Sequence, residues 1–165
     1  DSLTNVNNRL AFERDFERAT YRTSRYAGEN LGLLIIDVNG LKKLNDTHGH
    51  MLGDRVIIFV ADVLKQAIRK SDQVYRMGGD EFFVLLAPGH NESCKHLAKR
   101  IRQLVQARAL LVNENSANGT DSINIALSIG YATTEEYDIC ELVNVADQRM
   151  YEDKKSFYSE NNFSE

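Results

Sequence analysis

Three acidic residues stand at the ends of expected β-strands, where their carboxylates could act together. The apolar run "LGLLIID", residues 31–37, predicts a buried central strand that ends at Asp37. Asp80 and Glu81 directly follow two glycines between two strand-like runs, a pattern that predicts a tight hairpin. If these strands are neighbours, two or three carboxylates converge beside a turn that has no side chains.

Converging carboxylates indicate a bound cation. Like charges repel one another unless protons or a cation lie between them. A hard divalent ion, Mg²⁺ or Mn²⁺, held by carboxylate oxygens and by a substrate phosphate would remove this repulsion. Paired glycines would let the ligand approach the backbone closely. The pattern therefore indicates a metal-dependent site for a phosphate-bearing ligand.

The two acids after the glycines are expected to differ in role. Neighbouring strand residues point to opposite faces, so only one of Asp80 and Glu81 can face Asp37 squarely, and Phe82 would share the face of Asp80. We expect Asp80 to be the catalytic carboxylate and Glu81 its partner. The alternative is that both acids are exposed residues after a turn.

The remaining pattern predicts one domain, residues 1–165, with an α/β (α+β) fold. Helical periodicity or capping signals predict four helices. The first covers about 7–27 and is capped by Asn7 or Asn8, the second follows the loop-rich segment 38–54, and the third covers 91–112. The last begins at Asp138, where Glu141 completes a capping box. Residues 123–130 alternate as a strand, and a polar tail, 156–165, is expected to fray. Because a hairpin is antiparallel, we expect a central mixed, partly antiparallel sheet flanked by helices.

Composition narrows the ligand and the compartment. A net charge of -4 argues against a nucleic-acid polymer as partner but leaves a nucleotide open. Cys94 and Cys140 are expected to be buried, reduced thiols. No apolar run has the length of a membrane span, which favours a cytoplasmic domain without direct membrane contact. The opening "DSLTNVNNR" has no Met and indicates a piece of a longer protein, whose other parts could be membrane-anchored.

The motifs together resemble one known family. "GGDEF", residues 78–82, is the signature of the GGDEF diguanylate cyclases. "DSLTNVNNR" (1–9), "DVNGLKKLNDTHGHMLGD" (37–54), "LSIG" and "VADQRMY" are similar to its other segments, in order and spacing, from residue 1 to about 155. The resemblance implies a catalytic domain with the palm-like fold of nucleotidyl cyclases and polymerases. It also implies condensation of two GTP into cyclic di-GMP, with release of two pyrophosphates, by two-metal phosphoryl transfer.

The resemblance also implies roles for individual residues. The two ions per site, Mg²⁺ or Mn²⁺, would be held by Asp37, the carbonyl of Val38 and Asp80, with Glu81 assisting. The substrate-binding set would be Asn45 and Asp54 on guanine, Lys42 and Lys154 on the triphosphate, and Gly78 and Gly79. Without the resemblance, Asn45 and Asp54 would be read as turn and helix-cap residues, and both lysines as solvated.

Regulation and assembly follow from the same resemblance. "RKSD", residues 69–72, is similar to the family's inhibitory product site, in which Arg69 and Asp72 bind cyclic di-GMP; the alternative is an ion pair between these two side chains at a helix end. Because one domain carries one GTP site, the active species should be a homodimer, driven by an upstream sensor domain.

Phe157, Tyr158 and Ser159 replace the family's Gly-Arg-Asn. The alternative function is a catalytically silent module that binds GTP or cyclic di-GMP.

Overall fold

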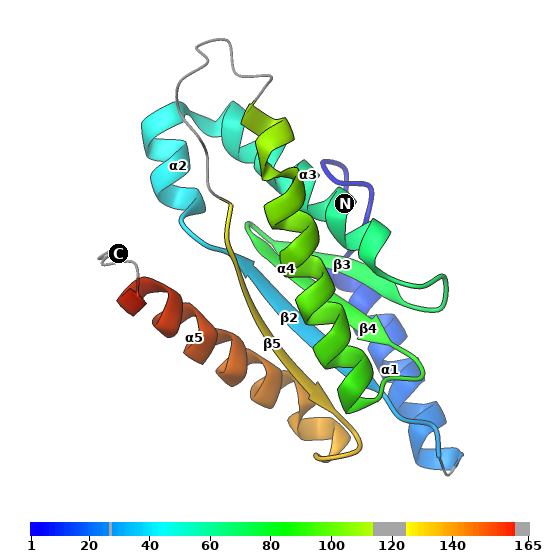
Figure 1. Ribbon diagram of the computed structural model, residues 1–165. Helices are drawn as coiled ribbons and strands as arrows, with labels where there is room; N and C mark the ends of the chain where they lie inside the picture. Colours follow the sequence, from blue (N-terminus) through cyan, green and yellow to red (C-terminus); the bar gives the residue numbers. More distant parts are fainter. Residues whose placement is uncertain (27, 114–124, 161–165) are drawn as a thin grey trace.

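The computed structural model describes residues 1–26, 28–113 and 125–160. These residues form three layers, with a five-stranded sheet between two layers of helices (Figure 1). The strand order is β1-β3-β4-β2-β5. The strands are β1 (Asn7–Asn8), β2 (Gly32–Val38), β3 (Gln73–Gly78), β4 (Glu81–Leu86) and β5 (Leu127–Thr133). β1 pairs parallel with β3, and the other neighbours are antiparallel. The expected mixed sheet is therefore confirmed.

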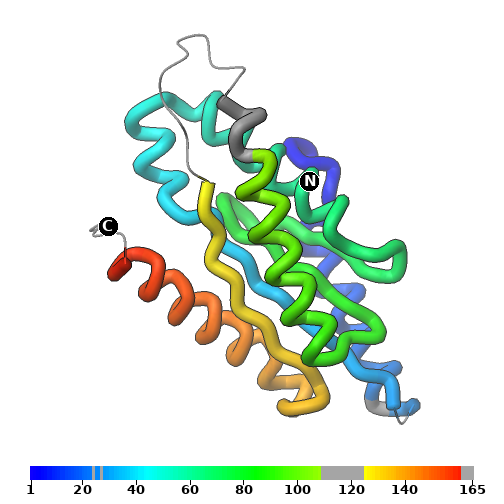
Figure 2. Tube along the Cα trace, viewed as in Figure 1, coloured from blue at the N-terminus to red at the C-terminus, as the bar shows by residue number. Residues whose placement is uncertain are grey.

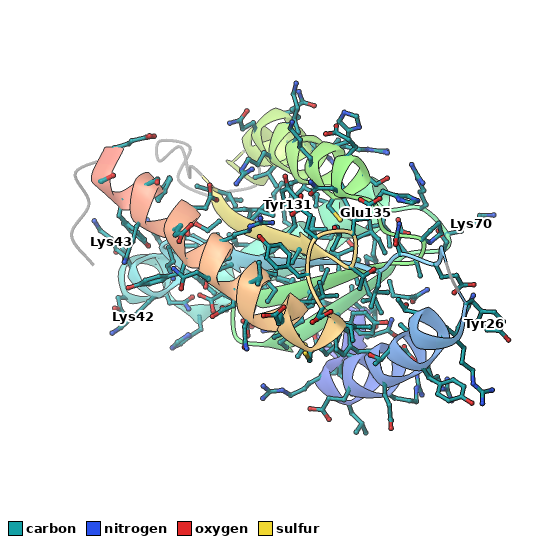
Figure 3. The ribbon with its side chains drawn as sticks, turned by 90° about the horizontal axis from the view of Figure 1, so that it is seen from below. Tyr26, Lys42, Lys43, Lys70, Tyr131 and Glu135 are labelled. Carbon is teal, nitrogen blue, oxygen red and sulfur yellow. The ribbon has the colours of Figure 1, made fainter. Side chains whose placement is uncertain are left out.

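Helices cover both faces of this sheet. Those on one face are α3 (His50–Ala67) and α4 (Asn91–Asn113), and those on the other are α1 (Arg9–Arg25) and α5 (Leu142–Glu160). Figure 3 shows the layers from the end of the sheet, with α4 on one side and α1 and α5 on the other. A short helix, α2 (Leu41–His48), follows β2, and a 3₁₀ turn, η1 (Ile139–Glu141), precedes α5. Among the described helices, none is long and apolar enough to cross a membrane.

The two faces of the sheet follow from alternation along the strands. Leu34 and Ile36 of β2 pack towards α3 and α4, whereas Leu33 and Ile35 pack towards α1 and α5. β2 is apolar on both faces because both are covered by helices. Continuing the alternation, Asp37 faces the side of α1 and α5, and this direction decides which helices can contact it.

Two helices begin at the residues that the sequence indicates. The Asn8 Oδ1 atom accepts a hydrogen bond from the Ala11 N–H at 3.0 Å, so Asn8 rather than Asn7 caps α1. At η1 the capping box is present, and the Glu141 carboxylate accepts from the Asp138 N–H at 3.3 Å. Both caps satisfy backbone donors that the first turn of a helix leaves free.

The segment 38–54 is helical rather than loop-rich, so that expectation is wrong. α2 occupies its middle, and α3 begins within it at His50 (Figure 2). Gly40 (φ 72°) and Gly49 (φ 86°) let the chain turn at both ends of α2. As a result, Asp54 lies inside α3 and does not cap a helix.

The hairpin turn is shifted by one residue from the expected position. β3 extends to Gly78 and β4 begins at Glu81, so the turn is Gly79-Asp80 rather than the two glycines. A register shift between Arg76 and Gly78 inserts one extra residue into β3. Asp80 therefore lies in the turn, and strand alternation does not fix the direction of its side chain.

Two element ends also differ from expectation. α5 continues to Glu160, past the residue at which we expected fraying. The Ser156 hydroxyl donates to the Glu152 carbonyl, four residues earlier, at 3.1 Å, a contact that fits a helical backbone. β5 begins at Leu127 and continues to Thr133, whereas residues 123–124 of the expected strand and 161–165 of the expected tail lie outside the described residues.

The two thiols lie in different environments. Cys94, in the first turn of α4, is buried, as expected, but Cys140 in η1 is exposed, so the expectation for Cys140 is wrong. η1 contributes no buried residue, because the 3₁₀ turn runs over the surface before α5 begins.

Candidate active site

The first strand and the hairpin bring two acids opposite each other. Asp37 of β2 and Glu81 of β4 are antiparallel register partners, so their side chains lie on the same face of the sheet. The Val38 N–H donates to the Asp80 carbonyl at 3.3 Å, which joins the end of β2 to the turn of the hairpin. Glu81, rather than Asp80, is the acid that faces Asp37 squarely.

A lysine from α5 neutralises the first of these acids. The Lys154 Nζ atom lies 3.1 Å from Asp37 Oδ1, and the two side chains are 24% and 14% exposed. Burial lowers the pKa of Lys154, but the hydrogen bond to Asp37 and the charge of Asp37 outweigh burial and raise it overall. Lys154 therefore remains an ammonium ion next to Asp37.

Glu81 has a less favourable environment. Burial raises the pKa of Glu81 above its ordinary value, and the nearby charges of Asp147 and Asp37 raise it further, while Arg9 opposes them. Asp147 on α5 and Arg9 on α1 were not singled out from the sequence. Both helices pack on the face that carries Glu81, so these charges could have been found once the strand alternation was assigned.

The arrangement only partly matches the expected metal centre. Over the described residues, no group of three or more His, Cys, Asp or Glu side chains is placed to hold a metal ion. The carboxylate oxygens of Asp37 and Glu81 and the carbonyl of Val38 are nonetheless the hard ligands that Mg²⁺ and Mn²⁺ prefer. Asp37 forms an ion pair with the ammonium group of Lys154, so a positive charge is accommodated next to this carboxylate.

Arg76 holds the hairpin turn, a role that the sequence did not indicate. Its Nε and Nη2 atoms donate to the Gly79 carbonyl at 3.0 and 2.8 Å, and its Nη1 atom donates to Asp1 Oδ1 at 3.1 Å. The Thr4 hydroxyl donates to the same Asp1 oxygen at 2.7 Å. The segment before α1 is thereby linked to the turn that carries Asp80.

The expected base and phosphate contacts are distributed over α2 and α3. Asn45 is half-buried on α2, and a Cβ atom on Gly53 would collide with its carboxamide, so the two helices are in close contact there. Asp54 follows Gly53 and is exposed. Lys42 is an exposed residue of α2, and Figure 3 shows it projecting from that helix.

The segment 69–72 forms a turn between α3 and β3. The buried Asp72 carboxylate accepts from the Arg69 backbone N–H and from the Ser71 hydroxyl, both at 3.1 Å. Across the described residues no ion pair joins the Arg69 and Asp72 side chains, and Arg69 is exposed. Lys70, next to Arg69, lies at the opposite end of the molecule from Lys42 (Figure 3).

Comparison with known proteins places the whole arrangement in one group. Residues 1–159 match the family described as "Diguanylate cyclase, GGDEF domain". The chain is 37% identical over 152 residues to Diguanylate cyclase DosC of Escherichia coli (strain K12), covering 92% of this chain and 32% of that protein. It is also 37% identical over 152 residues to Diguanylate cyclase TpbB of Pseudomonas aeruginosa, covering 92% of this chain and 34% of that protein. The chain thus spans about a third of the length of these relatives.

Solved structures agree with this grouping. The GGDEF domain of TpbB from Pseudomonas aeruginosa superposes with a TM-score of 0.81 at 35% sequence identity, covering 94% of this chain and 88% of that chain. The GGDEF domain of DgcB from Caulobacter crescentus, in complex with c-di-GMP, superposes with a TM-score of 0.84 at 30% identity, covering 94% and 90%.

Proposed function

The chain belongs to the GGDEF family of diguanylate cyclase domains, and from this membership we propose that it condenses two GTP molecules into cyclic di-GMP with release of two pyrophosphates. The observation that supports the proposal most directly is the meeting of Asp37, Glu81 and the Asp80 turn at one end of the sheet. This end also carries the Lys154 ammonium, so acidic and basic groups suited to a metal–triphosphate complex lie together.

The acids would hold the divalent ions. Asp37, Asp80 and the Val38 carbonyl are the proposed ligands of two Mg²⁺ or Mn²⁺ ions, with Glu81 as an additional carboxylate. Bound ions would make a ribose 3′-hydroxyl a better nucleophile and stabilise charge on the phosphates and the leaving pyrophosphate. Asp80 lies in a turn that Arg76 holds through the Gly79 carbonyl, so the backbone that carries its carboxylate is fixed.

Lysines and glycines would position the triphosphate. Lys154 is held by Asp37 here, and a phosphate oxygen is an alternative partner for its ammonium group. Lys42 is exposed on α2 and can reach an anionic ligand without breaking a structural contact. Gly78 and Gly79 have positive φ values of 149° and 52° and leave the turn open to close approach of a ligand.

Two polar side chains would read the base. Guanine presents N–H donors at N1 and N2 that adenine lacks, and carboxylate or amide oxygens accept from them. Asn45 and Asp54 lie on helices that contact each other, and Asn45 Oδ1 is a buried acceptor with no hydrogen-bond partner within the described part of the chain. A buried acceptor of this kind favours a ligand that donates to it.

Assembly and feedback complete the proposal. One domain offers one GTP site, and joining two nucleotides reciprocally requires two sites facing each other, so the active form would be a two-fold homodimer. Arg69 is exposed and can grip guanine in a bidentate manner, while Asp72 orders the turn from which Arg69 projects. Cyclic di-GMP bound there would inhibit the enzyme. An upstream sensor domain would control the dimer.

Nucleotide chromatography tests the activity. A forced dimer of the chain, incubated with GTP and Mg²⁺, is expected to produce cyclic di-GMP, and Asp80→Asn is expected to abolish the product. Glu17→Gln is the matched control, since it removes an exposed carboxylate on α1. A demonstrably dimeric wild-type sample that yields no cyclic di-GMP would reject the proposal.

Two observations favour a catalytically silent binding module instead. Asp37 is already paired with Lys154, and α5 remains helical through Phe157, Tyr158 and Ser159, where the family's Gly-Arg-Asn is missing. Calorimetry separates the two functions. A silent module would bind GTP or cyclic di-GMP and convert no GTP, whereas the cyclase would bind both and convert GTP.

A further inference from the structure

We propose that Gly53 is a specificity-determining position, because the absence of a side chain there leaves the space that the Asn45 carboxamide, the proposed reader of guanine, occupies. The inference rests on the proposed guanine site and adds to it a residue that need not contact the nucleotide. It depends on one contact, between the second turn of α2 and the first turns of α3.

The contact leaves no room for a Cβ atom. A Cβ built on Gly53 would lie 2.8 Å from Asn45 Cγ and 3.2 Å from Nδ2, and closer still to Oδ1. These three atoms of the Asn45 carboxamide are the nearest to that position. Gly53 is buried within α3, and glycine is unfavourable in a helix interior, so packing against Asn45 gives this glycine a structural reason.

The backbone fixes Asn45 from the other side. The Gly49 N–H donates to the Asn45 carbonyl at 2.8 Å, which closes the last turn of α2 before the chain enters α3. The backbone of Asn45 is therefore anchored, and only its side chain can yield to a larger residue at position 53. Any displacement then falls on the carboxamide, the group proposed to recognise the base.

The Asn45 carboxamide is poised for a donor. Its Oδ1 atom is buried and lacks a hydrogen-bond partner over the residues that the structure describes. Leaving a buried acceptor unpaired is costly, and a guanine N–H that reached this oxygen would pair it. Adenine has no such groups at these positions, so the orientation of this oxygen affects GTP more than ATP.

The structure therefore separates two effects of Gly53→Ala. The fold should tolerate the methyl group, because the atoms that it meets are the end of a flexible side chain. Base recognition should not tolerate it, because the carboxamide must rotate or shift to make room. Asn45→Ala would empty the space and make Gly53→Ala harmless.

A double-mutant cycle on this chain tests the inference. The variants are Gly53→Ala, Asn45→Ala and their combination, and the probes are 3′-deoxy-GTP and 3′-deoxy-ATP, which lack the attacking hydroxyl and cannot be turned over. Calorimetry with Mg²⁺ is expected to show about tenfold weaker binding of 3′-deoxy-GTP by Gly53→Ala, corresponding to one lost hydrogen bond to a buried group. Binding of 3′-deoxy-ATP should change by less than about twofold, and the double variant should bind 3′-deoxy-GTP no more weakly than Asn45→Ala.

The outcomes distinguish this inference from the proposed function. Wild-type-like binding of 3′-deoxy-GTP by Gly53→Ala, or an additive loss in the double variant, would overturn the role of Gly53 even if the chain makes cyclic di-GMP. An equal loss for both nucleotides would also overturn it, since it would indicate general damage rather than loss of base recognition. Selective loss in a chain that binds 3′-deoxy-GTP but makes no cyclic di-GMP would support the inference and reject the cyclase. Failure of wild type to bind 3′-deoxy-GTP would overturn both.

Discussion

Gly130→Ala should destabilise the protein strongly, because the backbone of α5 lies directly against this glycine of β5. A Cβ atom on Gly130 would lie 2.8 Å from the carbonyl carbon of Arg149, and closer to the Ala146 carbonyl oxygen and the Met150 nitrogen. All three are backbone atoms, so no rotamer change can relieve the collision. Either α5 or β5 must move.

The size of the effect follows from what such a movement would disturb. Restoring an ordinary contact distance requires a separation on the order of 1 Å, which forfeits much of the dispersion energy of the contacts that move apart. Two hydrogen bonds tie α5 to β5 beside the glycine, from Arg149 Nη1 to the Tyr131 carbonyl at 2.7 Å and from the Ile129 N–H to Asp153 Oδ2 at 2.9 Å. Overpacking typically costs about 1–3 kcal/mol, and a collision with backbone places Gly130→Ala near about 3 kcal/mol.

Thermal unfolding measures this loss. For a chain of this size, about 3 kcal/mol lowers Tm by roughly 6–12 °C. Gly53→Ala is the matched control, because the atoms nearest to the added methyl group there belong to the flexible Asn45 side chain and the change removes an unfavourable glycine from a helix, so its Tm should not fall. If Gly130→Ala melts within about 2 °C of wild type, the close packing of α5 on β5 is not as the structure has it.

The remaining predictions concern charge, thiol reactivity and the hairpin turn. Because burial and the neighbouring acids raise the pKa of Glu81, the folded protein loses stability as the pH rises through the raised pKa. Glu81→Gln should therefore raise Tm at pH 7 in EDTA. A gain in Tm that is as large at pH 4 would contradict this reasoning. Burial raises the pKa of Cys94 to about 12, so iodoacetamide at pH 8 should label Cys140 and spare Cys94, as mass spectrometry can determine; rapid labelling of Cys94 in the folded protein would refute its burial. Arg76→Lys keeps the charge but loses the two guanidinium hydrogen bonds to the Gly79 carbonyl, so a urea titration should show a free energy of unfolding lower by about 1–2 kcal/mol. An unchanged midpoint would show that the turn does not need these two hydrogen bonds.

Local patterns in the sequence were sufficient for most of the fold. The period of 3.6 along α3 and α4, the apolar run of β2 and the polar signals at Asn8 and Asp138 act within a few residues of each other, and each element forms where its pattern indicates. α2 was missed because it has only eight residues, and the glycines that bracket it resemble those of a loop. The bulge in β3 was also hidden, since it depends on how β3 pairs with β4 rather than on its own residues.

The site was less accessible from sequence because its contacts depend on helix packing. We expected Asp37 and the hairpin acids to meet only if their strands were neighbours, and β2 and β4 are neighbours with Asp37 and Glu81 as register partners. The ion pair of Lys154 with Asp37 depends on where α5 lies against β5, which Gly130 permits and no local pattern reveals. The hydrogen bond from Arg76 to Asp1 similarly joins residues that lie 75 positions apart in the sequence.

The positions of the charges indicate how the fold tolerates its acids. Directly opposed like charges destabilise an antiparallel pair, and Asp37 faces Glu81 in this way. The two helices on that face offset the repulsion, since α5 contributes Lys154 to Asp37 and the charge of Arg9, at the start of α1, favours ionised Glu81. Arg9 is exposed and Lys154 is partly so, and both are long, flexible side chains that another ligand can displace at little cost to the core. The core therefore does not depend on the Lys154–Asp37 ion pair or on the charge of Arg9, and a divalent ion or a phosphate that replaced a cation would act on the acids without disturbing the packing beneath them.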